Sequence, residues 1–245
     1  TAAVAAELPR HVPCRAAVHV VGAGASPALL GAGRQREPDK TAEIDKIAEI
    51  DKIAEITARL DLPPRYVLAV GTLEPRKGID TLFAALAEPD AVQLPVLLAG
   101  QQGWGGLDPA DVARRAGLDP RRVRVLGRIS DPELAVVLHG AAVLAAPSRA
   151  EGFGLPVLEA MAAGVPVVHS DAPALVEVAG GAGETFVRDD PAALSAALNV
   201  VLTDQARAEA MITAGRRRAQ QFTWEHTARQ VWSVHLELYR ARSSD

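Results

Sequence analysis

The best candidates for chemistry in this 245-residue sequence are two glutamates, Glu151 and Glu159, which are separated by the seven residues GFGLPVL. A short apolar run precedes Glu151, Gly152 and Gly154 follow it, and Pro156 is expected to open a helix that carries Glu159. Backbone N–H groups at a helix start bind anionic oxygens, and glycine allows close approach of a ligand to the backbone. The stretch therefore indicates a phosphate-binding turn with one carboxylate in the loop and one on the helix.

The proline between the two carboxylates gives them different positions. Glu151, in the loop, could face the reacting part of a ligand, whereas Glu159, one turn into the helix, suits a diol such as a ribose. The N–H groups around Gly154 and Leu155 are expected to meet anionic oxygens. Taken singly, Glu151 is explained more simply as a loop carboxylate that caps a helix, and Glu159 as a solvent-facing helix residue. A second loop of suitable chemistry on the same sheet edge favours the site.

That second loop is GTLEPRKG, residues 71–78, which places Arg76 and Lys77 directly before a helix. A pyrophosphate would satisfy both cations and the positive end of the helix. Considered alone, the loop is explained more simply as a solvated basic turn, and the spacing of a P-loop is absent.

A third loop, GRIS at residues 127–130, follows another expected strand. A glycine followed by Arg128 and Ile129 could let main-chain groups reach a planar base. An ordinary turn between a strand and a helix is the simpler explanation of this loop by itself.

The scaffold for these loops is an alternation of strands and helices. The expected strands cover 66–70, 95–99, 122–125, 142–146, 166–170 and 185–187. The expected helices cover 79–88, 109–116, 132–140, 156–163, 174–179, 191–203, 205–221 and 223–241. This spacing predicts an α/β fold, a Rossmann-like doubly wound parallel sheet with helices on both faces and a helical carboxyl terminus. Ligands of such sheets bind beyond the carboxyl ends of the strands, where all three loops begin.

Several of these helices begin with the dipeptide Asp-Pro. Asp108, Asp131 and Asp190 each precede a proline, so we expect all three aspartates to be N-caps followed by proline at the first helical position.

Composition excludes several classes of function. Apolar residues make up 49% and charged residues 23%, and the net charge of −4 argues against a broad nucleic-acid surface. No apolar run reaches the roughly 18 residues that span a bilayer, and the start of the chain does not read as a signal peptide. The histidines lack zinc-site spacing and there is no nucleophile elbow, so neither a metal site nor a hydrolase triad is expected.

The amino-terminal third is organised differently. Residues 18–21, VHVV, predict a strand, and Gly22 and Gly24 after it permit an NAD-binding interpretation, which we rank below a linker because Pro27 interrupts the glycine pattern. The tandem repeat AEIDKI predicts a helix over 41–60 with isoleucine at every third position. We therefore divide the chain into a linker or domain remnant at 1–38, a repeat-containing helix at 39–60 and the α/β domain at 61–245.

The sequence from Tyr66 to Arg240 resembles the donor-binding half of glycosyltransferase family 4. The resemblance rests on GTLEPRKG, on VRVLGRISDPELAVVLHGAAVLAAPSRAEGFGLPVLEAMAAGVPVV, and on the closing FTWEHTARQVWSVHLELYR. It implies one half of a GT-B fold, and residues 18–21 resemble the strand through which the preceding domain of such enzymes leads into this one.

The resemblance also implies roles for individual residues. Glu151 would lie against the donor sugar, Glu159 would bind the ribose hydroxyls, and Arg76 and Lys77 would bind the diphosphate and act as catalytic groups with Glu151. The implied substrate-binding set is Gly71, Thr72, Arg128, Ile129, Gly152, Phe153, Gly154, Leu155 and Glu159. In this set, Phe153 to Leu155 contribute backbone N–H groups, and Ile129 meets the base through its main chain.

The implied reaction transfers a sugar from a GDP- or UDP-sugar to an acceptor with retention of configuration and without metal or cofactor. The loop TLEPRK is similar to that of mannose- and deoxyhexose-transferring relatives, and the resemblance implies a cytoplasmic enzyme whose full-length form is peripheral at the inner membrane face. Fewer than 70 residues precede the sheet, too few for an acceptor domain, so the sequence predicts a carboxyl-terminal fragment that needs such a domain or self-associates through its last helices, and that is inactive or weakly active alone. The alternative is a truncated or engineered scaffold without turnover.

Overall fold

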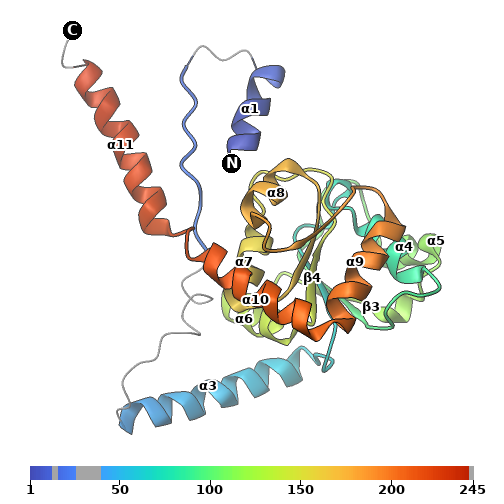
Figure 1. Ribbon diagram of the computed structural model, residues 1–245. Coiled ribbons are helices and arrows are strands. Elements are labelled where there is room, and N and C mark those ends of the chain that lie inside the picture. The colour runs from blue at the N-terminus through green and yellow to red at the C-terminus, as the bar shows by residue number, and fades with distance from the viewer. Residues whose placement is uncertain (13–15, 26–39, 243–245) are drawn as a thin grey trace.

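The structure is a computed structural model that describes residues 1–12, 16–25 and 40–242. Its body is a six-stranded sheet in which every pairing is parallel, with strand order β3-β2-β1-β4-β5-β6 (Figure 1). The strands are β1 Val67–Val70, β2 Val96–Ala99, β3 Val123–Gly127, β4 Val143–Ala146, β5 Val167–Ser170 and β6 Glu184–Phe186. This order confirms the doubly wound Rossmann-like sheet, and it reverses direction between β1 and β4, where such sheets bind ligands.

Helices cover both faces of the sheet, because successive strand residues point to opposite sides. One face buries Val67 and Ala69 under α4 Ile79–Ala87, α5 Pro109–Ala116 and α9 Pro191–Thr203. The other face buries Leu68 under α6 Asp131–Gly140, α7 Leu155–Ala163, α8 Pro173–Ala179 and α10 Gln205–Ala219. Two single turns of 3₁₀ helix, η2 Pro75–Lys77 and η3 Pro120–Arg122, complete the connections.

Every strand and helix expected from residue 66 onward is present, with ends that coincide or differ by one or two residues. Asp108 and Asp190 cap α5 and α9 by accepting from Ala110 N–H and Ala193 N–H. The prediction that Asp131 caps α6 is wrong. Ser130 is the N-cap there and forms a capping box with Glu133, so Asp131 lies inside the first turn, where its charge meets the positive helix end.

The strand predicted at residues 18–21 is absent. These residues are extended but belong to no sheet, and Val18 and Val20 remain exposed. An extended segment becomes a strand only where a neighbour supplies ladder hydrogen bonds, and the described sheet ends at β3 and β6. Gly24 packs instead against the backbone of Trp224, where an added Cβ would come within 2.5 Å of the amide nitrogen. The NAD-binding interpretation of Gly22 and Gly24 thereby loses its strand.

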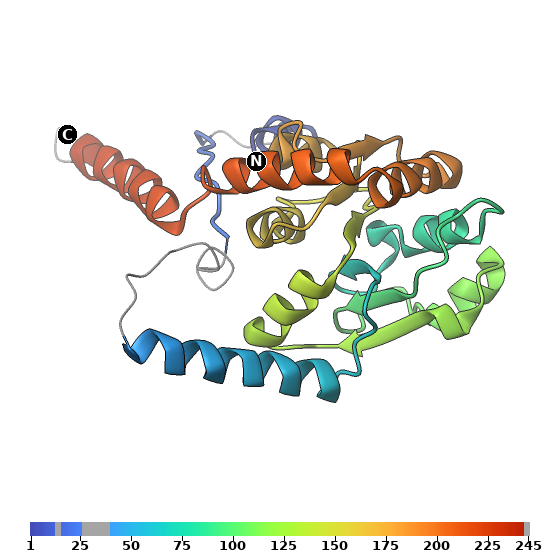
Figure 2. The same cartoon turned by 60° about the horizontal axis from the view of Figure 1, so that its bottom comes forward.

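The repeat forms the predicted helix, α3 Lys40–Arg59, and its last turn meets the body. Ile56 is buried, while Ile50 and Ile53 are exposed, and Arg59 binds Glu133 of α6 at 2.7 Å. The rest of α3 extends away from the body (Figure 2). Residues 13–15 and 26–38 of the predicted linker or domain remnant at 1–38 lie outside the described residues, and the division of the chain into three parts stays a prediction.

Two further helices lie outside the two layers. α1, Ala2–His11, packs on α8, and its first N–H groups donate to the Glu177 carboxylate. α11, Trp224–Arg242, extends from the end of α10 away from the sheet (Figure 1). On this helix, Trp224 is 50% exposed and Trp232 is 61% exposed.

Candidate functional site

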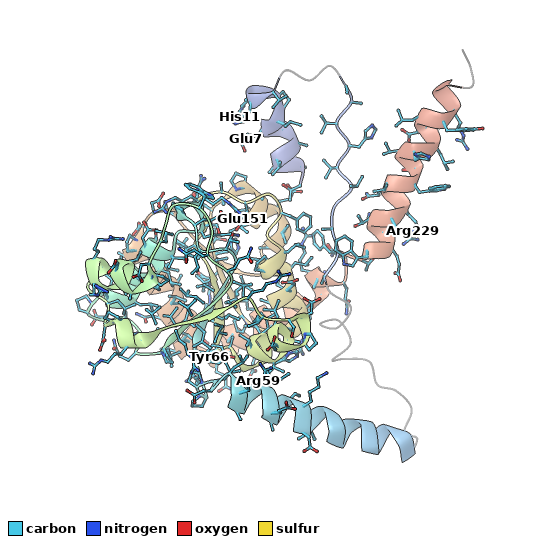
Figure 3. The ribbon with its side chains drawn as sticks, turned by 180° about the vertical axis from the view of Figure 1, so that it is seen from behind. Glu7, His11, Arg59, Tyr66, Glu151 and Arg229 are labelled. Carbon is cyan, nitrogen blue, oxygen red and sulfur yellow. The ribbon has the colours of Figure 1, made fainter. Side chains whose placement is uncertain are left out.

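The loops after β1 and β4 pack directly on each other at the point where the strand order reverses. The Arg149 N–H donates to the Arg76 carbonyl at 2.7 Å. Gly78 ends η2 in the left-handed region, with φ +66°, and an added Cβ would lie 2.1 Å from the Pro147 carbonyl oxygen. Glycine is therefore required here both for backbone conformation and for the contact between the loops. Figure 3 shows Glu151 toward one end of the body and Tyr66, which precedes β1, toward the other.

Three side chains bind the Glu151 carboxylate. Lys77 Nζ donates to Oε1 at 2.5 Å, Arg76 Nη1 donates to Oε2 at 3.1 Å, and Ser148 Oγ donates to Oε1 at 2.7 Å. The side chains of Glu151 and Lys77 are only 10% and 12% exposed. The structure thus joins the basic pair and the loop carboxylate in one cluster, although their sequence positions lie more than 70 residues apart.

Arg76 lies between two carboxylates. Its Nη2 binds Glu74 Oε1 at 2.6 Å, while its Nη1 binds Glu151 and the Ala150 carbonyl, each at 3.1 Å. Glu74 is buried, with 7% exposure. With Lys77, the cluster holds two cations and two carboxylates, so its formal charge is zero. An incoming diphosphate would compete with Glu151 for the same N–H groups.

The surroundings of Glu151 keep it ionised. Burial by itself would raise the pKa of this carboxyl, but the hydrogen bond and charge of Lys77, the Ser148 hydroxyl and the charge of Arg76 together hold its pKa below the ordinary value. A carboxylate at this position is therefore available to accept hydrogen bonds from a neutral ligand across the physiological pH range.

Arg149 links the loop after β4 to the loop after β1, to α4 and to Asp189. Its guanidinium binds Asp80 of α4 at 2.8 Å, Asp189 at 2.6 Å and the Pro75 carbonyl at 2.6 Å. Ser148, Glu74 and Arg149 were not among the residues singled out from the sequence. Each is next to or within three positions of one that was, and which of the neighbours turns toward the cluster depends on loop conformation.

The lining of a pocket beside the cluster includes five predicted site residues, Gly71, Thr72, Lys77, Glu151 and Gly154, together with Ser148 and apolar residues of the core. It encloses about 20 Å³, which is room for about one water molecule. Gly71 lies under Lys77, since an added Cβ would come 3.0 Å from Lys77 Cε. A nucleotide would have to lie over this opening or displace the Lys77–Glu151 pair.

Gly154 begins α7 from the left-handed region, with φ +98°, and an added Cβ would come within 2.6 Å of Leu175 Cδ2. Pro156 has no N–H and Val157 N–H donates to the Gly154 carbonyl at 3.0 Å, so the N–H groups that this helix start offers a ligand are those of Gly154 and Leu155. Phe153 packs edge-on to Phe222, with ring centroids 5.9 Å apart, which leaves its backbone rather than its ring for a ligand. Leu155 is 37% exposed, and Gly152 is exposed as well.

Glu159 lies on α7, half-buried, in an environment unlike that of Glu151. Burial, and then the negative charge of Asp131 at the start of α6, raise its pKa to about 7. Strongly shifted pKa values are more frequent at functional sites than elsewhere in proteins.

The third candidate loop follows β3. Gly100 N–H donates to the Gly127 carbonyl at 2.9 Å, which joins this loop to the end of β2. Arg128 is exposed, and the half-buried Ile129 side chain packs on the core of the α7 face. Its main chain stays available, but neither residue lines the pocket beside Glu151.

Among the described residues, no group of three or more His, Cys, Asp or Glu side chains is placed to hold a metal ion, so metal-free chemistry stays a prediction. No described helix combines the length and apolar character needed to cross a membrane.

Comparison with known proteins adds a family. The family model described as Glycosyl transferases group 1 matches residues 52–218, which include β1 to β6 and both glutamates. The O-antigen chain mannosyltransferase B of Escherichia coli is 38% identical over 176 residues, which are 71% of this chain and 46% of that protein. The chain therefore spans about half the length of this relative.

Solved structures agree with this match. Sucrose-phosphate synthase from Thermosynechococcus elongatus superposes with a TM-score of 0.73 at 29% identity, over 98% of this chain and 57% of the other. Anabaena HepE, solved in complex with UDP and glucose, gives a TM-score of 0.66 at 25% identity, over 76% of this chain and 52% of the other. These neighbours confirm the expectation of one Rossmann-like half of a GT-B fold.

Proposed function

Because the chain belongs to the group 1 glycosyl transferases, we propose that it binds the nucleotide-diphosphate sugar from which a hexose is transferred to an acceptor. The observation that carries the proposal is the Arg76–Lys77–Glu151 cluster, at the sheet edge where the strand order reverses. Two cations and the start of α7 meet there beside the Glu151 carboxylate, which suits a diphosphate linked to a sugar.

Arg76 and Lys77 bind the diphosphate in this proposal, with Gly71 and Thr72 beneath it. When the bond between the anomeric carbon and the phosphate oxygen breaks, the electron pair stays on the phosphate. The two cations and the N–H groups at Gly154 and Leu155 stabilise that charge without a metal ion.

Glu151, released from the cations, accepts hydrogen bonds from the sugar hydroxyls, and the backbone around Gly152 and Phe153 lies along the sugar. Glu159 accepts from the two ribose hydroxyls. The main chain of Ile129, with Arg128 beside it, meets the base at the end of β3. Retention of the anomeric configuration and membership of glycosyltransferase family 4 are parts of the same proposal.

The donor is a GDP- or UDP-sugar. The similarity to the O-antigen chain mannosyltransferase B supports mannose as the transferred sugar, and the similarity to HepE, solved in complex with UDP and glucose, supports a UDP-sugar. The acceptor is bound elsewhere, by a second domain that faces this sheet edge or by a partner chain that α11 contacts. The matches to natural enzymes give no support to an engineered scaffold without turnover.

Titration calorimetry with UDP-glucose and GDP-mannose tests the proposal. One of the two is expected to bind the wild-type chain and to bind Glu159→Ala at least about tenfold more weakly, because a charged hydrogen-bond acceptor is lost. Arg207→Ala, which removes an exposed ion pair between α10 and Glu184 at the start of β6, is the control and should leave affinity unchanged. If neither nucleotide sugar binds the wild-type chain, the proposal is contradicted.

A further inference from the structure

We propose that Ser148 is a positioning residue, which keeps Glu151 directed at the donor sugar once the diphosphate has engaged Arg76 and Lys77. The inference rests on the proposed function and deepens it, because it separates binding of the sugar from binding of the nucleotide. Neither the sequence motifs nor the family assignment gives this serine a role.

The argument begins with the three side chains that bind Glu151. Arg76 and Lys77 are the groups that a diphosphate would bind, because both are positively charged hydrogen-bond donors. Ser148 differs, because its hydroxyl is neutral and the residue is only 3% exposed. A bound donor would therefore compete for two of the three contacts and leave the contact from Ser148 Oγ to Glu151 Oε1, at 2.7 Å, intact.

Ser148 is itself fixed to the sheet. Its carbonyl accepts a hydrogen bond from the hydroxyl of Ser170 at 2.5 Å, and Ser170 is fully buried at the end of β5. The neighbouring strand thus supports the loop after β4 at the residue that contacts Glu151. This chain of contacts runs from β5 through Ser170 and Ser148 to the carboxylate and involves no group that a phosphate would bind.

The consequence is a difference between two ligands that share a nucleotide. Loss of the Ser148 hydroxyl leaves Arg76, Lys77 and the start of α7 in place, so the nucleoside diphosphate alone should bind as before. When the two cations bind the phosphates, the Glu151 carboxylate is then no longer held by a hydrogen bond from the loop. Its hydrogen bonds to the sugar are therefore weaker. The ratio of the dissociation constants for nucleotide sugar and nucleoside diphosphate isolates this effect.

The experiment is calorimetry on the full chain with UDP and UDP-glucose, and with GDP and GDP-mannose. In Ser148→Ala, the ratio is expected to rise about tenfold over the wild-type ratio, the effect of one hydrogen bond to a charged group. Ser170→Ala should raise it in the same direction but less. Ser195→Ala, which removes a buried hydroxyl from α9 on the opposite face, is the matched control and should leave the ratio unchanged.

A double-mutant cycle with Glu151→Ala distinguishes positioning from general loosening of the loop. Without the carboxylate, Ser148→Ala should change the ratio no further. If the ratio in Ser148→Ala equals the wild-type ratio, whether both ligands bind equally more weakly or both bind as before, the role of Ser148 is overturned and the proposed function stays intact. If the wild-type chain binds neither nucleotide sugar, the proposed function itself fails. Thermal unfolding of each variant confirms that the loss is measured on folded protein.

Discussion

Glu151 and Glu159 are the same residue type, eight positions apart, yet the fold gives their carboxyl groups opposite properties. Glu151 is surrounded by two cations and a hydroxyl group, which hold its pKa below the ordinary value. Glu159 is half-buried without a cation and faces the charge of Asp131, so its pKa rises to about 7. Burial opposes ionisation at both sites, and the presence or absence of a neighbouring cation decides the outcome.

This difference matches the two proposed roles. A carboxylate that stays ionised can exchange its cations for sugar hydroxyls at any physiological pH. A carboxyl that titrates near neutrality binds the ribose well only when it is ionised. The contributions of the two glutamates to binding can therefore be distinguished by neutralising each carboxylate, by varying the pH and by replacing a neighbouring charged residue.

The largest effect is expected when the cation beside Glu151 is removed. Lys77→Met should weaken binding of the nucleotide sugar about a hundredfold, because a charge-assisted contact to phosphate is lost. It should also raise the pKa of Glu151 and so make the two glutamates more alike. Arg121→Met, which removes an exposed ion pair with Asp119, is the control. Calorimetry that gives equal affinity for Lys77→Met and wild type would remove Lys77 from the site.

The next effect concerns the pH dependence of donor binding. Affinity of the wild-type chain should rise between pH 6 and pH 8 as Glu159 ionises, whereas Glu151 stays ionised throughout. Glu159→Gln should bind about tenfold more weakly at pH 8 and should lose most of the rise. Titrations at three pH values check this, and an identical rise in Glu159→Gln would assign the titration to another group.

Stability should depend on pH in opposite ways at the two sites. The pKa of Glu159 is raised from 4.5 to about 7, so its stabilising contribution is complete below pH 4.5 and is lost as the pH rises toward 7. The pKa of Glu151 is lowered, so its contribution is present above the ordinary value and is lost as the pH falls through its folded pKa. We expect changes on the order of 1 kcal/mol after allowance for solvent screening.

Urea unfolding of Glu159→Gln and Glu151→Gln between pH 3 and pH 8 measures these contributions. Glu159→Gln should gain stability relative to wild type as the pH rises from 4.5 to 7, and Glu151→Gln should lose relative stability as the pH rises from 3. The same slope in both variants would show that their environments do not differ as described.

The smallest effect should come from Asp131. Asp131→Asn removes the negative charge that faces Glu159 and should move the midpoint of the pH-dependent binding to lower pH by a fraction of a unit. Asp111→Asn, at the exposed start of α5, serves as the control and should not move the midpoint. An unmoved midpoint in Asp131→Asn would leave burial as the only cause of the raised pKa.

Much of the fold could be predicted because its signals are local. Short apolar runs alternate with helices that begin at proline, and parallel pairing with right-handed crossovers follows from that spacing. The strand predicted at residues 18–21 failed because a strand depends on a partner, which local sequence does not reveal. Asp131 and Ser130 are both good N-caps, and the capping box with Glu133 favours the serine.

The site shows the same limit. Glu151, Arg76 and Lys77 could be selected by residue type and by the sheet edge they share. The ion pairs between them could not be predicted from the sequence, because these pairs depend on how two loops pack against each other at Gly78. The positions of Ser148 and Glu74 in the cluster, and the effect of Asp131 on Glu159, are likewise products of side-chain placement in three dimensions.

The central claim is that the Arg76–Lys77–Glu151 cluster exchanges its internal carboxylate for the diphosphate of a nucleotide sugar. A crystal structure of the chain with the better-binding of UDP-glucose and GDP-mannose tests it directly. We expect phosphate oxygens within hydrogen-bond distance of Arg76 and Lys77, Glu151 turned to the sugar with Ser148 still donating to it, and Glu159 at the ribose hydroxyls. A nucleotide bound away from the ends of β1 and β4, with the Lys77–Glu151 pair unbroken, would contradict the account.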